Sequence, residues 1–151
     1  MIKRILLSVL VVMPLLGKNN PQEAELMAKL NKLEQIKKEI AEKEKYIDQL
    51  NAECSNLFDC IGYGYDKEQR DNIWLELNKL EQYITHALLN NIDVNKAIRE
   101  QLCPSLTVHR NELARMQNIT VRGCVEYFFL MKLYQQYTDI VADILKIQLE
   151  S

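Results

Sequence analysis

The chain has 151 residues, enough for one domain with a modest hydrophobic core. Its 19 basic and 21 acidic residues give a net charge of −2, which disfavours nucleic-acid binding because that activity depends on clustered lysine and arginine. Only 4 Gly and 3 Pro residues occur, so few turns are available and sheet architectures are disfavoured. We therefore expect an all-α protein, in which an antiparallel helical hairpin or coiled coil packs with C-terminal helices into a small bundle.

The N-terminus has the pattern of a signal peptide. Lys3 and Arg4 precede an apolar run over residues 5–16. That run has the length of a signal-peptide core and is shorter than the about 20 residues that a membrane-spanning helix needs. The pattern predicts an exported protein of the periplasm or the extracellular space.

The predicted cleavage lies near Gly17. Residues 1–17 are then the signal peptide and residues 18–151 a single helical domain. Leu15 is unfavourable two positions before this site, so an uncleaved membrane anchor and a buried N-terminal segment are the alternatives. Cleavage would leave 17 basic residues against 21 acidic ones, a mildly acidic mature chain.

The first predicted helix covers residues 21–58. Asn20 suits a helix cap and Pro21 suits the first helical position. Lys29 and Lys43 interrupt one row of an otherwise regular coiled-coil seam. The seam residues recur with a seven-residue period and are Leu26, Leu33, Ile36, Ile40, Ile47, Leu50, Cys54 and Leu57. A helix with so narrow an apolar stripe requires a partner helix.

A second helix is predicted over residues 67–90. Asp66 and Gln69 are a candidate capping box at its start. Its apolar positions alternate spacings of four and three and are Ile73, Leu77, Leu80, Ile84 and Ala87. We expect residues 21–58 and 67–90 to form an antiparallel hairpin.

The rest of the chain is also predicted to be helical. Asp93 is expected to cap a short helix that stops before Pro104. Helix is favoured from residue 105 onwards, with a kink or break at residues 118–123, where β-branched residues and a glycine are poor helix formers.

The C-terminal helix is apolar almost all round over residues 127–137. Such a helix is either buried centrally or contacts another molecule. We favour central burial. In the alternative, Phe128 and Phe129 are contact residues of a protein interface.

The four cysteines are Cys54, Cys60, Cys103 and Cys124. An even number in a small exported protein predicts two disulfides, and no C-x-x-C pair indicates a zinc or redox site. A helical stretch between Cys103 and Cys124 would separate them by roughly 30 Å, whereas a disulfide needs Cα atoms within about 7 Å. We therefore expect one bridge from Cys54 and one from Cys60, to Cys103 and Cys124 in either order. Free buried thiols are the alternative if the chain is not exported.

No catalytic, cofactor or metal site is predicted. His109 and Glu112 lie one helical turn apart, but the H-E-x-x-H and G-x-S-x-G motifs of hydrolases are missing. The glycines around Tyr63 and Tyr65 indicate a turn between helices, whose exposed tyrosines are candidate contact residues.

The sequence favours a non-enzymatic protein that binds another protein or a second copy of itself. We interpret it as an interaction or structural subunit of a bacterial envelope, such as part of a secretion or surface assembly. The alternative is a periplasmic inhibitor or immunity protein that blocks an enzyme or toxin, with Tyr63 and Tyr65 as the inserted residues. No small-molecule substrate is evident, and membrane contact is expected only if the N-terminal segment is uncleaved.

Overall fold

The structure is a computed structural model that describes residues 20–61, 64–96 and 110–150. The predicted signal peptide and the expected end of the short helix before Pro104 lie outside these residues.

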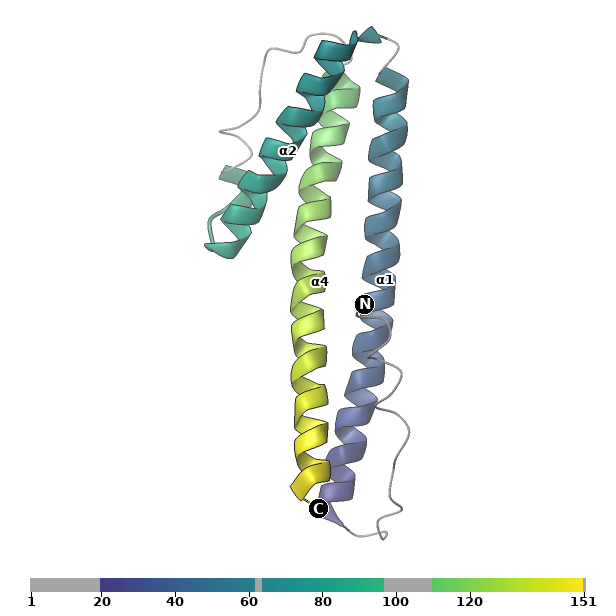
Figure 1. Ribbon diagram of the computed structural model, residues 1–151, viewed down its shortest axis with the longest axis vertical. Coiled ribbons are helices and arrows are strands. Elements are labelled where there is room, and N and C mark those ends of the chain that lie inside the picture. Colours follow the sequence, from purple (N-terminus) through teal and green to yellow (C-terminus); the bar gives the residue numbers. More distant parts are fainter. Residues whose placement is uncertain (1–19, 62–63, 97–109, 151) are drawn as a thin grey trace.

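Within the described ranges the chain is helical and contains no strand. The long helices are α1 (Pro21–Ile61), α2 (Lys67–Leu89) and α4 (Arg110–Glu150). Figure 1 shows α1 and α4 running side by side along the length of the molecule, with α2 against one end of α4. The all-α bundle expected from the sequence is confirmed.

Side-chain caps fix the starts of α1 and α2, as the sequence predicts. The Gln22 amide donates to Asn20 Oδ1 at 3.0 Å. At the start of α2, the Gln69 amide donates to Asp66 Oδ1 at 2.8 Å, and the Asp66 amide donates to Gln69 Oε1 at 3.0 Å. This reciprocal capping box satisfies two amides that a helix start otherwise leaves without partners.

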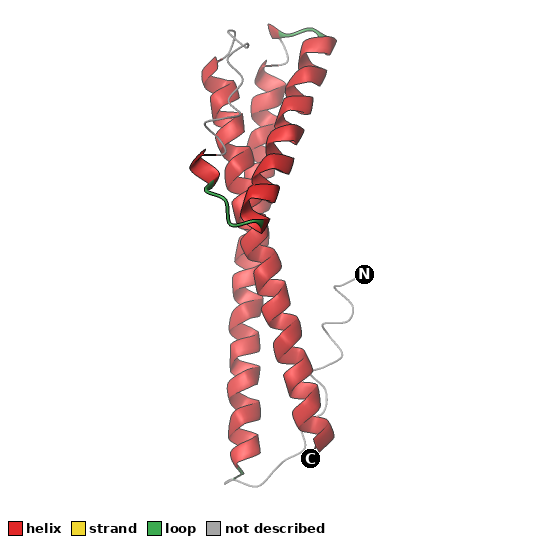
Figure 2. Ribbon diagram, turned by 90° about the vertical axis from the view of Figure 1, so that its left-hand side faces the viewer, coloured by secondary structure: helices red, strands yellow, loops and turns green. Residues whose placement is uncertain are grey.

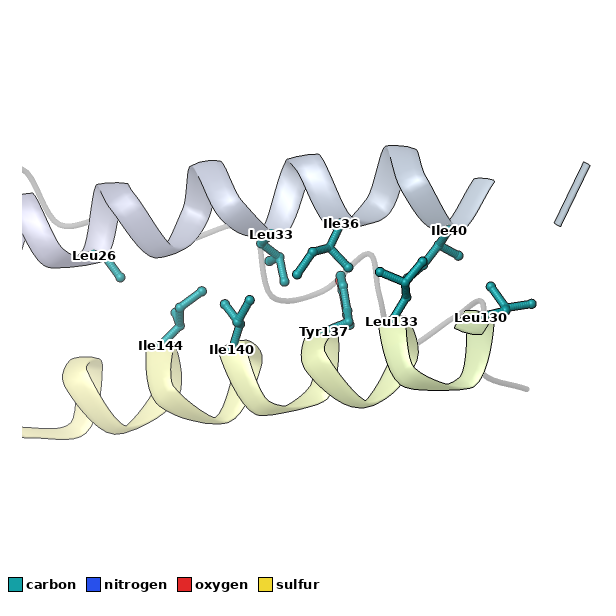
Figure 3. Close-up of a cluster of buried hydrophobic side chains, with 9 residues drawn as sticks. All are labelled: Leu26, Leu33, Ile36, Ile40, Leu130, Leu133, Tyr137, Ile140 and Ile144. Carbon is teal, nitrogen blue, oxygen red and sulfur yellow. The ribbon is translucent and has the colours of Figure 1, made fainter. Parts of the chain in front are cut away.

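The partner of α1 is α4, not α2. The expected hairpin of residues 21–58 with 67–90 is wrong on this point, since α1 and α2 each pack mainly on α4. The buried side chains between α1 and α4 meet in Figure 3 and are Leu26, Leu33, Ile36, Ile40, Leu130, Leu133, Tyr137, Ile140 and Ile144. Both α1 and α4 have 41 residues, whereas α2 has 23 and is too short to cover the seam of α1.

Lys29 and Lys43, which interrupt the seam, form ion pairs with α4. Lys29 Nζ lies 3.1 Å from Asp143 Oδ2, and Lys43 Nζ lies 2.7 Å from Glu126 Oε2. Lys29 pairs with a residue late in α4, and Lys43 pairs with a residue earlier in α4, so the two helices are antiparallel. Each half-exposed pair stabilises the fold by about 1 kcal/mol or less, but together they favour one register.

All three helices contribute to one hydrophobic cluster at the end of the molecule where α1 connects to α2. The rings of Phe58 on α1 and Trp74 on α2 lie 4.6 Å apart between centroids. The buried residues here are Ile61, Tyr65, Ile73, Leu77, Leu113 and Met116. Further along α2, the buried residues Leu80, Ile84 and Ala87 cluster with side chains of α4 and none of α1. The two helices α1 and α2 therefore touch only near their connection.

Helix α4 is continuous through residues 118–123, so the expected kink or break is wrong. Thr120 Oγ1 donates to the Met116 carbonyl at 2.9 Å, within the helix. Met116 and Ile119 are buried. Their packing outweighs the weak helix propensity of this stretch, as tertiary contacts commonly do.

Candidate functional site

A cavity of about 390 Å³ lies where α2 separates from α1 over the surface of α4. All three helices line it, with Cys54 from α1, Trp74 and Glu81 from α2, and Gly123 and Cys124 from α4. No sequence motif indicates this cavity, because its lining residues come from three distant segments.

The two cysteines in the cavity are half-buried, and both are poor nucleophiles. Burial raises the pKa of Cys54, although a hydrogen bond with Thr120 opposes the shift. Burial and the nearby Glu81 carboxylate raise the pKa of Cys124 to about 11. Because the thiolate is the reactive form, both side chains are neutral and unreactive near pH 7.

The structure contains no disulfide among the cysteines it describes. Cys54, Cys60 and Cys124 are free thiols, and Cys103 lies outside the described residues. Cys54 contacts Thr120, whereas Cys124 Sγ lies 3.9 Å from the Glu81 carbonyl oxygen on α2. The bridges predicted from Cys54 and Cys60 to Cys103 and Cys124 stay a prediction.

Tyr65 is buried, contrary to the exposed position expected from the sequence. Its side chain is 8% exposed and belongs to the three-helix cluster. Burial raises its pKa, and Glu112 adds to the shift. Tyr63 and His109 lie outside the described residues. The hypothesis of an inhibitor that inserts two tyrosines thus loses Tyr65 as an exposed contact.

The expected central burial of residues 127–137 holds for one face of α4 only. Leu130, Leu133 and Tyr137 pack against α1. By contrast, Tyr127, Phe129 and Met131 are 56%, 46% and 49% exposed. Figure 2 shows that α2 ends partway along the molecule, so among the described helices only α1 packs on the rest of α4.

Lysines lie over the phenylalanine rings of this surface. Lys132 Nζ is 4.5 Å from the ring centroid of Phe128 and 5.9 Å from that of Phe129. Lys43 Nζ is 5.6 Å from the Phe129 centroid. The two rings meet edge to face at 6.0 Å. Tyr127, Phe128, Phe129, Met131 and Lys132 follow one another around the solvent-facing side of α4, and we name them the aromatic patch. Tyr127, at one edge of the patch, also lines the cavity.

The described residues include neither a membrane-spanning helix nor a metal-binding cluster. None of their helices combines the length and apolar character of a membrane span. No group of three or more His, Cys, Asp or Glu side chains among them is arranged to hold a metal ion.

The fold and these surfaces define a small helical protein with an exposed aromatic patch and an interhelical cavity. No protein family, curated protein or solved structure matches the chain. Its function is therefore argued from the surfaces themselves.

Proposed function

We propose that the chain is an exported, non-enzymatic interaction or structural subunit of a bacterial envelope, and that the aromatic patch binds a partner protein. The exposure of Tyr127, Phe129 and Met131 carries the proposal. Aromatic residues and methionine are enriched at protein interfaces, and a few such side chains commonly supply most of the binding energy.

The patch is preorganised for binding. The ring of Phe129 lies against Phe128 and beneath the ammonium groups of Lys43 and Lys132. A cation over an aromatic face is stabilising, so these contacts restrict the ring before any partner arrives. Less side-chain entropy is then lost on association, which favours affinity.

Two sequence features support export. Lys3 and Arg4 followed by the apolar residues 5–16 have the order of a signal peptide. The partner would then lie in the same compartment. We assign the interaction to α4 rather than to the loop of Tyr65, because that tyrosine is buried.

Site-specific photo-crosslinking in the native host tests the proposal. A photoreactive amino acid replaces Met131 in the patch or, as a control, Asn31, which is exposed on α1. We expect a discrete adduct from position 131 and none from position 31. Phe129→Ala should reduce the adduct about tenfold or more, with a loss of only about 1 kcal/mol in the free energy of unfolding. Equal labelling at both positions would contradict the proposal.

A further inference from the structure

The cavity between α1, α2 and α4 is a wedge that is closed at one end. Trp74 lines this end, and its ring lies against that of Phe58 at 4.6 Å between centroids, with the two ring planes tilted by 41°. From Leu80 onwards the buried residues of α2 cluster with side chains of α4 and none of α1. Figure 1 shows the gap between the α1 and α2 ribbons widening away from their connection. The lining residues show that the wedge is a groove over α4.

The floor of the groove is open above the backbone of α4. Gly123 lines the groove, and a Cβ built on it would meet no atom within 4 Å. Another backbone could therefore approach α4 closely at this point. A bundle of four helices places a helix where three neighbours leave such a groove, at an interaxial distance of about 8–10 Å.

The walls combine apolar side chains, uncharged polar side chains such as Asn51 and Thr85, and a single charge. Ile47 and Leu77 face the groove from α1 and α2, and Glu81 is the one Asp, Glu, Lys, Arg or His side chain that lines it. Glu81 lies near enough to Cys124 for its charge to act on that thiol. Glu81 is exposed and, among the described residues, has no ion-pair partner.

We propose that this groove docks an α-helix of a partner protein, whose inserted face is apolar and carries a lysine or arginine opposite Glu81. A helix fits because it completes the bundle and buries its apolar face against three others. A basic residue fits because it pairs with the one charge in the lining. The inference rests on the proposed function and adds to it a second surface, which shares Tyr127 with the aromatic patch, and the chemistry of its partner.

The only tryptophan of the chain, Trp74, lines the groove and reports its occupancy by fluorescence. The probes are two synthetic amphipathic helical peptides that differ at one central position of the apolar face, Lys in one and Glu in the other. With the full chain, we expect the Lys peptide to shift the Trp74 emission to shorter wavelength and to bind roughly five- to tenfold more tightly than the Glu peptide. Glu81→Lys should reverse this preference.

Gly123→Met separates docking in the groove from binding elsewhere. The new side chain grows into the open space above α4, so the Trp74 response should weaken about tenfold or more. The variant should melt no lower than the native chain, because methionine favours helix more than glycine does. Gly123→Ala is the matched control, since its added methyl group meets nothing within 4 Å and should leave peptide binding intact.

Three outcomes would overturn the proposal. The first is equal binding of both peptides, or no binding of either. The second is unchanged binding to Gly123→Met. The third is a shift of the Trp74 emission that appears when the protein concentration is raised without peptide, together with the mass of a dimer. If Gly123→Met abolishes that shift, the occupant of the groove is a second copy of the chain. Crosslinking from Met131 tests the aromatic patch and not the groove. If crosslinking fails while the peptide still binds, the patch is not the binding surface and the proposal for the groove stands.

Discussion

Replacing Ile40 by alanine tests which helix covers α1. In the structure Ile40 lies in the cluster between α1 and α4, beside Leu133 (Figure 3). In an antiparallel hairpin of residues 21–58 with 67–90, Ile40 would instead face Ile84, because both lie about equally far from the connecting loop. The two arrangements predict different energetic coupling for the same side chain.

Ile40→Ala should lower the free energy of unfolding by about 2–4 kcal/mol. The side chain is 9% exposed, so almost all of the removed atoms lose buried contacts. Three methylene equivalents correspond to roughly 2.4 kcal/mol of transfer free energy, and the remaining cavity adds to this cost. A small domain is typically stable by about 5–15 kcal/mol, so the effect is large enough to measure.

Urea unfolding followed by circular dichroism measures the single and double variants. Ile40→Ala combined with Leu133→Ala should deviate from additivity by about 0.5–2 kcal/mol, because the two side chains share a cluster. Ile40→Ala combined with Ile84→Ala should be additive within about 0.5 kcal/mol. Leu149→Ala, at an exposed position of α4, is the control and should change stability by less than about 0.5 kcal/mol. Coupling of Ile40 to Ile84 and not to Leu133 would refute the pairing of α1 with α4.

Four further predictions concern the protonation of Tyr134, the reactivity of the thiols, the disulfide pairing and export. The Tyr134 hydroxyl donates to the Glu44 carboxylate, and this hydrogen bond together with burial raises the pKa of Tyr134 to about 12. The hydrogen bond should therefore stabilise the fold fully below pH 10 and lose this effect as the pH approaches 12. The difference in unfolding free energy between the native chain and Tyr134→Phe should shrink over that range. In reduced protein, Cys60 should be alkylated faster than Cys54 because it is exposed, and Cys124 should react more slowly than either because burial raises its pKa to about 11. Equal rates for these three thiols would contradict the burial of Cys124. In protein from its native compartment, peptide mapping without reductant should link Cys54 or Cys60 to Cys103 or Cys124, and a Cys103–Cys124 bridge would contradict that pairing. The intact mass should lack roughly the first 17 residues, and an uncut N-terminus would argue against cleavage.

Local features of the fold were predictable because their physics is local. Asp66 and Gln69 form their capping box over three residues, so neighbouring side chains and amides suffice to define the start of α2. The seven-residue period of Leu26, Leu33 and Ile40 likewise specifies which face of α1 is buried. Neither feature depends on the rest of the chain.

The pairing of helices was not predictable in this way. The seam of α1 is complementary to any apolar helical stripe, so its periodicity does not distinguish α2 from α4. Helix length and distant ion pairs decide between them. The pair of Lys29 with Asp143 links residues 114 positions apart, and no local pattern reveals such a contact.

The candidate sites divide along the same line. The sequence by itself marked residues 127–137 as core or interface, because their apolar character is a property of composition. Only the tertiary structure decided that Leu130 faces α1 while Met131 faces solvent, since exposure depends on where α2 ends. It also buried Tyr65 and created the groove at Gly123, because both depend on three helices meeting and then separating. Local hydrogen bonds and periodicity determined the helices of this protein, and long-range packing determined its surfaces.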